Sequence, residues 1–303
     1  MHFDHDDHQH APPASHRAFA LGVLLNVAYL VVEAVFGVLV GSLALLADAG
    51  HNLSDVLGLL MAWGASYLSM VRPTKRRTYG WRSSTILAAM ANALILLMAV
   101  GGIVWEAVRR LAEPRPVATT TMVAVAGVGV VINTATALLF LSGRKRDLNI
   151  RGAYLHMAAD AGVSLGVVVA GVMIAMTGWM WVDPAVSIVI ALVIFWGTWG
   201  LFRESTDLIL QAVPKGIDAR QVEAYLRQLP GVTDLHDLHI WAMSTTETAI
   251  TAHLVKPDAA DDDEFLSRTS RELQHRFGIG HATLQLEHGT DAANCRLASP
   301  DTV

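Results

Sequence analysis

Apolar residues gather into six long segments in the first two thirds of the chain, and short polar stretches separate them. The segments run over about Ala18–Val40, Leu43–Met70, Ser83–Leu111, Thr119–Leu141, Arg151–Thr177 and Asp183–Leu210. Each reaches or exceeds the roughly 20 residues that a helix needs to cross a bilayer. The pattern therefore predicts an α-helical membrane protein with six transmembrane helices.

From Pro214 onward the pattern changes to short elements with polar faces. Asp218–Leu229 predicts an amphipathic helix with Asp218 near its cap, and Asp261–Phe277 predicts a charged helix. Alternating residues predict three strands, over Leu235–Met243, Thr248–Lys256 and His281–Glu287. The order αββαβ is typical of a small α+β domain in which helices cover one face of a sheet.

These changes predict four parts along the chain. They are a His/Asp-rich disordered tail (1–16), a six-helix transmembrane domain (17–213), a small α+β domain (214–288) and a disordered tail (289–303). The N-terminus lacks the short apolar core and small-residue cleavage site of a signal peptide, so we expect no cleaved targeting segment.

Composition supports a membrane protein and excludes some partners and sites. Hydrophobic residues make up 53% of the chain and charged residues 16%, and the mean hydropathy of +0.41 is too high for an ordinary soluble protein. A net charge of −5 argues against a nucleic-acid partner. The single cysteine, Cys295, excludes an intrachain disulfide and a zinc cage built from cysteines.

Basic residues mark one side of the predicted membrane domain. The loop after the second segment holds Arg72, Lys75, Arg76, Arg77 and Arg82, and the loop after the fourth holds Arg144, Lys145, Arg146 and Arg151. The positive-inside rule then places both termini and the C-terminal domain in the cytoplasm. The first cluster is most simply a topology anchor. An alternative is that it pairs with Glu204 or Asp207 at the end of the sixth helix.

Two of the apolar segments carry the same pair of ionisable residues. His51 and Asp55 in the second segment, like His156 and Asp160 in the fifth, are four residues apart and so share one helix face. Buried carboxylates need a compensating charge, which a divalent ion supplies. Two nitrogen and two oxygen ligands favour Zn²⁺, with Co²⁺ and Cd²⁺ as competitors, over Mg²⁺ or Ca²⁺.

Two further carboxylates lie in the apolar segments, Asp48 and Glu33. Ala-Asp-Ala-Gly occurs both at 47–50 and at 159–162, and aligning these two runs would pair Asp48 with Asp160. Alignment on His-x-x-x-Asp gives two complete half-sites, so we expect Asp48 to be a transit or supporting carboxylate, or a structural one. Glu33 is expected to be a transit or supporting carboxylate that lines a water path, with the bonding of neighbouring helices as the alternative.

The chemistry of these ligands predicts competition between metal and protons. A metal-bound imidazole must be neutral and a bound carboxylate ionised, so zinc and protons compete for the same groups. A site that faced the two sides alternately would release zinc to protons from outside. Two alternatives use the same residues: a membrane zinc metalloenzyme and a zinc-sensing receptor. The chain has no His-Glu-x-x-His motif and no attached signalling module, so we expect neither an enzyme nor a receptor.

Four runs of residues carry a family resemblance. They are Ser42–Asp55, Thr78–Arg82, the fifth-segment pair His156 and Asp160, and Val232–Trp241. Together they resemble the cation diffusion facilitators, in particular the bacterial zinc-efflux branch, over about residues 17–288. The resemblance implies a homodimer in the bacterial cytoplasmic (inner) membrane with both termini cytoplasmic. It also implies a metallochaperone-like C-terminal domain, and export of Zn²⁺ in exchange for H⁺, giving zinc tolerance.

The same resemblance implies a regulatory metal site in the soluble domain, held by His236, His253 and Glu287. Gln285 stands where some relatives have histidine, which puts one ligand in doubt. Zinc bridging at a dimer interface would tighten these domains and raise transport.

Weaker candidate ligands are His239, His281 and His288. Strand alternation predicts that His236 and His239 face opposite ways, and His239 beside Trp241 has the alternative of a packed core residue. In the N-terminal arm, His2, His5, His8 and His10 are expected to collect metal loosely, or to belong to a tail without that role.

Overall fold

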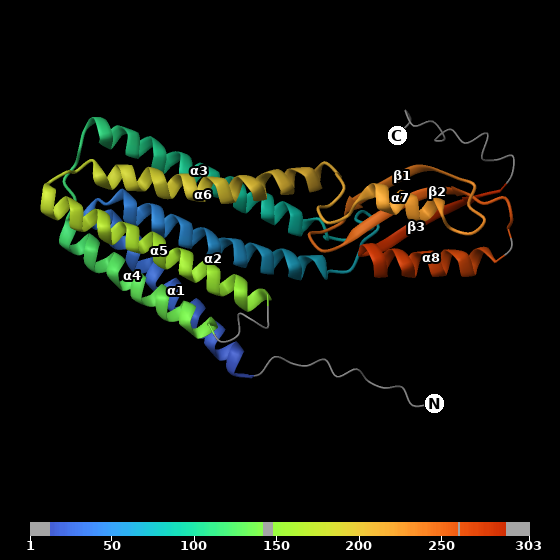
Figure 1. Ribbon diagram of the computed structural model, residues 1–303, viewed down its shortest axis with the longest axis horizontal. Coiled ribbons are helices and arrows are strands. Elements are labelled where there is room, and N and C mark those ends of the chain that lie inside the picture. The colour runs from blue at the N-terminus through green and yellow to red at the C-terminus, as the bar shows by residue number, and fades with distance from the viewer. Residues whose placement is uncertain (1–12, 142–147, 260, 289–303) are drawn as a thin grey trace. The chain divides into compact units, whose positions relative to one another are not determined.

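The computed structural model describes residues 13–141, 148–259 and 261–288 (Figure 1). Within them, six long helices precede a small α+β region, which confirms the predicted fold class. The long helices are α1 (Pro13–Val40), α2 (Leu43–Ser69), α3 (Ser84–Ala112), α4 (Thr119–Phe140), α5 (Leu148–Thr177) and α6 (Val182–Ile209). Over the described residues, α3 to α6 are long and apolar enough to span a bilayer, and α1 adds the shorter apolar stretch Val27–Val40.

The chain folds into two compact units, and α2, α3 and α6 each run from one into the other. The first unit contains the chain up to Leu57 and Ile95–Thr198, and the second contains Gly58–Leu94 and the chain from Trp199 onward. The N-terminal half of α2 and all of α5 therefore lie in the first unit, whereas the sheet lies in the second.

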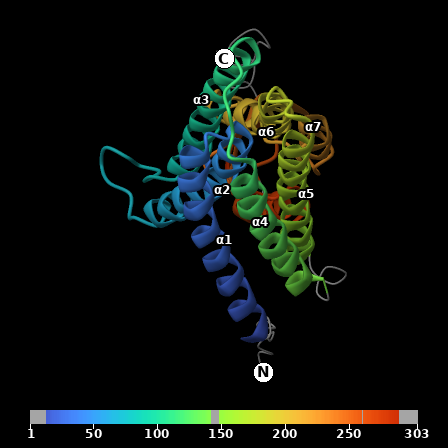
Figure 2. The ribbon, with the colours of Figure 1, turned by 90° about the vertical axis from the view of Figure 1, so that its left-hand side faces the viewer.

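The first unit is held together by close helix packing. Its buried core includes Leu45 of α2, Met122 of α4 and Val167 of α5. Helices α4 and α5 pack along each other, and α1 packs against α4 (Figure 2). A Cβ atom at Gly129 of α4 would overlap the side chain of Tyr29 on α1, so glycine is what permits this approach.

A buried carboxylate fastens the start of α2 to α6. Gly41 turns the chain in the left-handed region (φ 72°), and Asp183 of α6 meets the new helix start. Its oxygens accept hydrogen bonds from the Ser42 hydroxyl (2.6 Å) and from the next two backbone amides (2.9 and 3.2 Å). Arg110 of α3 lies 3.9 Å from the same carboxylate. A helix N-terminus favours a negative charge, so these contacts compensate Asp183 fully although it is completely buried.

The α+β region of the second unit has the predicted order of elements. They are α7 (Ala219–Arg227), β1 (Asp234–Ala242), β2 (Thr248–Val255), α8 (Asp262–Phe277) and β3 (Ile279–Glu287). The strand order is β1-β2-β3, with β1 and β2 antiparallel and β2 and β3 parallel. Asp218 caps α7 by accepting a hydrogen bond from the Arg220 amide, as predicted. Leu226 of α7 and Leu273 of α8 are fully buried in the core that these helices share with the sheet.

Candidate metal sites

Three of the four predicted transport-site residues meet in the first unit. His51 of α2 places its Nε2 3.4 Å from Asp160 Oδ1, and His156 of α5 places its Nε2 3.6 Å from Asp160 Oδ2. The two imidazole rings lie edge to face with centroids 6.1 Å apart. The Asp160 side chain is only 2% exposed, and within the described residues its Oδ1 accepts no hydrogen bond in good geometry.

These separations suit ligands of one metal ion. Two ligand atoms about 2.1 Å from a tetrahedral zinc lie about 3.4 Å apart, which is close to both nitrogen–oxygen distances here. The backbone of Asp55 continues α2 one turn beyond His51. Its side chain lies outside the described residues, so its part in the site stays a prediction.

Asp48 lies one turn before His51 on α2 and is completely buried. Its Oδ2 accepts a hydrogen bond from the Ser164 hydroxyl of α5 (2.8 Å), and within the described residues its Oδ1 has no hydrogen-bond donor. The hydrogen bond between Asp48 and Ser164 therefore also joins α2 and α5, the two helices that carry the candidate ligands.

Glu33 of α1 is completely buried and bonds neighbouring helices. It accepts hydrogen bonds from Tyr29 on its own helix (2.8 Å) and from the Asn52 side-chain amide of α2 (3.1 Å). These contacts are the ones expected of a residue that bonds helices together.

A second cluster lies on the sheet of the second unit. His236 of β1, His253 of β2 and Glu287 of β3 each place a ligand atom within 4.8 Å of the others. His253 Nδ1 is 2.9 Å from Glu287 Oε1, and His236 Nε2 is 3.4 Å from Glu287 Oε2. Neither atom of the latter pair has a hydrogen-bond partner among the described residues. The strand pairing explains the cluster, because His236 lies directly opposite His253 in the antiparallel ladder.

A bulge in β1 changes the predicted orientation of His239. The pairing shifts between His236, opposite His253, and His239, opposite Thr251, and Asp237 lies between them at φ 51°. Because residues 251 and 253 share one face of β2, the bulge returns His239 to the face of His236. The prediction that the two histidines face opposite ways is therefore wrong.

The bulge also brings Asp237 into the cluster, a residue that was not singled out from the sequence. Its Oδ1 is 2.9 Å from His239 Nε2, and its Oδ2 is 3.5 Å from His253 Nε2. The His239 side chain is 40% exposed, which contradicts the alternative of a packed core residue. The run His-Asp-Leu-His was the available signal, but nothing in it indicates a positive φ.

The remaining candidate ligands do not belong to these clusters in the described part of the chain. His281 is exposed and contacts the ring of Tyr79. His288 Nε2 lies 3.1 Å from Asp262, whose pKa is lowered mainly by its hydrogen bond from the Lys256 ammonium. Gln285 donates to Glu287 Oε1 at 3.3 Å, so it contacts the cluster without offering a histidine. His2, His5, His8 and His10 lie outside the described residues.

Within the described residues, the basic loop after α2 forms no ion pair with Glu204 or Asp207, the two partners of the alternative interpretation. Glu204 receives the Lys215 ammonium (2.8 Å) instead. Of the loop residues, Arg82 pairs with Glu247 (3.0 Å) and Arg77 stacks on Trp81.

Two family models match nearly the whole chain. The cation efflux transmembrane domain matches residues 19–210, and the cation efflux protein cytoplasmic domain matches residues 214–289. The chain belongs to the cation diffusion facilitator family. This cation diffusion facilitator is therefore a multi-pass metal-cation efflux transporter and not an enzyme, and the metalloenzyme alternative is wrong.

Relatives resemble this cation diffusion facilitator over almost their full length. The cadmium, cobalt and zinc/H⁺-K⁺ antiporter of Bacillus subtilis is 34% identical over 292 residues, covering 95% of this chain and 93% of the relative. The metal cation efflux system protein CzcD of Cupriavidus metallidurans is 36% identical, with 98% and 95% covered. The zinc transporter ZitB of Escherichia coli is 36% identical, with 94% and 95% covered.

Proposed function

We propose that this protein exports Zn²⁺ from the cytoplasm in exchange for protons, as a homodimer in the bacterial cytoplasmic membrane with both termini inside. The observation that carries the proposal is the position of Asp160 between the imidazoles of His51 and His156, deep in a helical membrane unit. The names of two relatives, a cadmium, cobalt and zinc/H⁺-K⁺ antiporter and a zinc transporter, support zinc as a transported ion and, for the first, H⁺ as one counter-ion.

The nitrogen and oxygen ligands of the transport site favour zinc. His51, His156 and Asp160 supply two nitrogens and a carboxylate, and Asp55 would complete four ligands. Imidazole ligands suit Zn²⁺ and its close competitors Cd²⁺ and Co²⁺, whereas Mg²⁺ and Ca²⁺ require shells of oxygen. Asp48 and Glu33 would act beside this site, Asp48 as a transit or supporting carboxylate and Glu33 as a tie between α1 and α2.

Proton coupling follows from the same side chains. Each ligand binds either zinc or a proton, so a site that opens to the proton-rich side exchanges one for the other. The inward proton gradient then drives zinc outward. His51 and His156 are 26% and 42% exposed, whereas the Asp160 side chain is 2% exposed.

Transport into proteoliposomes tests the proposal. Purified protein is reconstituted, and zinc uptake is measured with and without a pH gradient, alongside the pH change that zinc drives. We expect His51→Ala and Asp160→Ala to lose both signals. His275→Ala, which removes an exposed histidine of α8, should keep them. Zinc-driven proton movement of wild-type size in either site variant would overturn the assignment. The same assay with Cd²⁺, Co²⁺, Ni²⁺ and Mn²⁺ gives the selectivity.

We also propose that His236, His253 and Glu287 hold a regulatory zinc in the cytoplasmic domain. The facing atoms His236 Nε2 and Glu287 Oε2, 3.4 Å apart without hydrogen-bond partners in the described chain, support this. Calorimetric zinc titration of full-length Asp160→Asn protein isolates this site from the transport site. We expect His253→Ala in that background to remove the tightest remaining binding, whereas any loose binding by the N-terminal histidines would persist. Unchanged binding would remove these residues from the site.

A further inference from the structure

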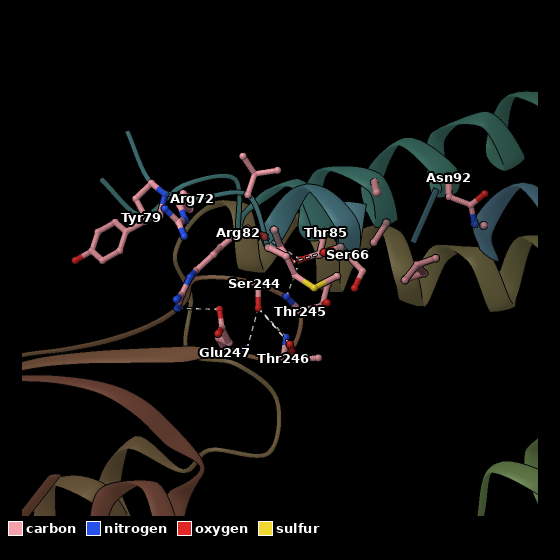
Figure 3. Close-up of a pocket in the computed structure, with 18 residues that line it drawn as sticks. Ser66, Arg72, Tyr79, Arg82, Thr85, Asn92, Ser244, Thr245, Thr246 and Glu247 are labelled. Atoms are coloured by element: carbon pink, nitrogen blue, oxygen red, sulfur yellow. Dashed lines mark hydrogen bonds and ion pairs between the residues drawn. The ribbon is translucent and has the colours of Figure 1, made fainter. Parts of the chain in front are cut away.

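A cavity of about 680 Å³ lies in the second unit, and no residue of either histidine cluster lines it. Its walls come from the C-terminal half of α2, the start of α3, the loop between them, Leu201 of α6 and the turn between β1 and β2 (Figure 3). A volume of this size is typical of pockets that hold small-molecule ligands.

The two ends of the cavity differ in chemistry. Figure 3 shows Arg72, Tyr79 and Arg82 toward one end and Asn92 at the other. Gly58, Ala88, Ala89 and Leu201 give the helical walls small or apolar surfaces. Hydroxyl and backbone groups of residues 244–246 line the basic end. The cavity is therefore amphipathic, with a charged end and a mostly apolar end.

The charged end has an excess of positive charge. Among the lining residues the ionised side chains are Arg72, Arg82 and Glu247. Arg82 is paired with Glu247 at 3.0 Å, but Arg72 is exposed and makes no ion pair or hydrogen bond within the described part of the chain. An unpaired guanidinium repels a divalent cation and suits phosphate, which it can bind with two parallel hydrogen bonds.

We expect this end of the cavity to lie at the level of lipid headgroups. Helix α2 ends at Ser69 and α3 begins at Ser84, so the lining of the cavity continues from the loop into two helices of the membrane domain. Tyr79 and Trp81 beside it are 51% and 38% exposed, and aromatic side chains of this kind are enriched at membrane interfaces. Basic pockets between transmembrane helices on the cytoplasmic side bind acidic lipid headgroups.

We propose that this cavity binds an anionic phospholipid. Arg72 receives the phosphate, with Arg82 and the hydroxyl groups of the β1–β2 turn around the headgroup. The acyl chain follows the small and apolar residues of α2, α3 and α6. A free phosphate would use the same guanidinium but would gain nothing from the apolar walls.

Lipid titration of the full-length protein in a neutral detergent tests this site. Binding of phosphatidylglycerol is measured by native mass spectrometry against phosphatidylcholine with the same acyl chains, and glycerol phosphate serves as a soluble competitor. We expect Arg72→Gln to weaken phosphatidylglycerol binding about 10-fold or more. Lys75→Gln is the matched control, because it removes the same charge from the same loop but does not line the cavity.

A second variant has the opposite expected sign. Glu247→Gln releases Arg82 from its ion pair and removes a negative charge from the cavity, so we expect phosphatidylglycerol to bind several-fold more tightly. Phosphatidylcholine binding should change in none of the variants, and circular dichroism checks that helix content is kept.

Three results would overturn the proposal. Equal losses in Arg72→Gln and Lys75→Gln would show general surface attraction without a site. Unchanged or weaker binding in Glu247→Gln would exclude Arg82 from the headgroup. Full competition by glycerol phosphate at concentrations matching the lipid would show an anion site that does not use the apolar walls.

Discussion

Asp160 and Asp183 are two buried carboxylates of the same helical unit with opposite surroundings. Asp183 accepts hydrogen bonds from a hydroxyl and two helix amides, and Arg110 lies nearby. Asp160 has two imidazoles at 3.4 and 3.6 Å, and one of its oxygens lacks a hydrogen-bond donor in the described residues. Asp183 is held by fixed hydrogen-bond donors, so its buried charge has a structural role. Asp160 is flanked by imidazoles that can themselves bind a proton or a metal ion, so its carboxylate can exchange one partner for another.

The largest expected effect is on stability, from Asp183→Ala. The change leaves Arg110 and the start of α2 without their buried partner, which costs about 3–5 kcal/mol in the free energy of unfolding. Asp207→Ala on the same helix removes an exposed carboxylate and is the matched control. Denaturant unfolding in detergent checks this. Equal stability of the two variants would contradict a structural role for Asp183.

Asp160→Asn should affect zinc and leave the fold unchanged. We expect the affinity of the transport site for zinc to fall by about 100-fold or more, because a direct ligand is at least as important as the supporting residues that cost 10–100-fold. The free energy of unfolding should fall by much less than in Asp183→Ala, because Asn keeps the shape of the side chain and removes the buried negative charge. Calorimetric titration and the same unfolding assay measure both quantities. A large loss of stability in Asp160→Asn with unchanged zinc affinity would show that Asp160 is structural and not a zinc ligand.

Asp48 lies between these extremes, since one of its oxygens has a donor and the other has none in the described chain. Ser164→Ala removes that donor and should lower stability by about 1–3 kcal/mol. If Asp48 supports the transport site, zinc affinity falls by about 10-fold as well. Ser267→Ala on the exposed face of α8 is the control. Unchanged stability would show that the Asp48–Ser164 bond contributes nothing measurable.

The smallest effect on stability is expected for a carboxylate–guanidinium pair that is exposed to water. Arg227 lies 2.8 Å from Asp234, and this hydrogen bond lowers the pKa of Asp234. Stability from a lowered pKa is present above the unfolded value and is lost as pH falls through the folded one. Both side chains are more than two fifths exposed, so Arg227→Gln should cost no more than about 1 kcal/mol at pH 7.

That difference should shrink in acid, below the lowered pKa of Asp234, to the part due to the hydrogen bond that Arg227 donates to the Leu235 carbonyl (3.0 Å). Unfolding at pH 7 and at successively lower pH measures it, with Arg268→Gln as the control, because Arg268 is exposed on α8 and has no ion pair in the described residues. A cost that persisted unchanged at the lowest pH would mean that Arg227 stabilises through packing and not through Asp234.

Periodicity predicted the elements of this protein because each long helix is apolar and each ends at a clear break. Gly41 and Gly178 both adopt positive φ beside helix ends, and the predicted ends of α2 and α6 differ from the observed ones by one residue. Helix α1 begins earlier than predicted, at Pro13, because the apolar pattern marks only the part of a helix that the membrane surrounds.

Local spacing predicted the His-x-x-x-Asp pairs of α2 and α5, whereas His236, His253 and Glu287 were predicted from the family resemblance. His51 with His156 and Asp160, and His236 with His253 and Glu287, lie close together in the structure. The role of Asp183 was not predictable, because its partners are 139 to 141 residues away along the chain. The inclusion of Asp237 depends on a bulge, and the assignment of Asp55 stays a prediction.

The hydrogen bonds between Asp183 of α6 and the start of α2 fix these two helices to each other at one end. Helix α2 has 27 residues and, at about 1.5 Å per residue, is about 40 Å long. A small change in its tilt at the fixed end therefore moves its other end by a larger distance. A tilt too small to break the hydrogen bonds at Ser42 therefore becomes a displacement of several ångströms near Ser69. Tilting of α2 about this fixed end would separate the other ends of the helices without any sliding of α2 past α6 at Ser42.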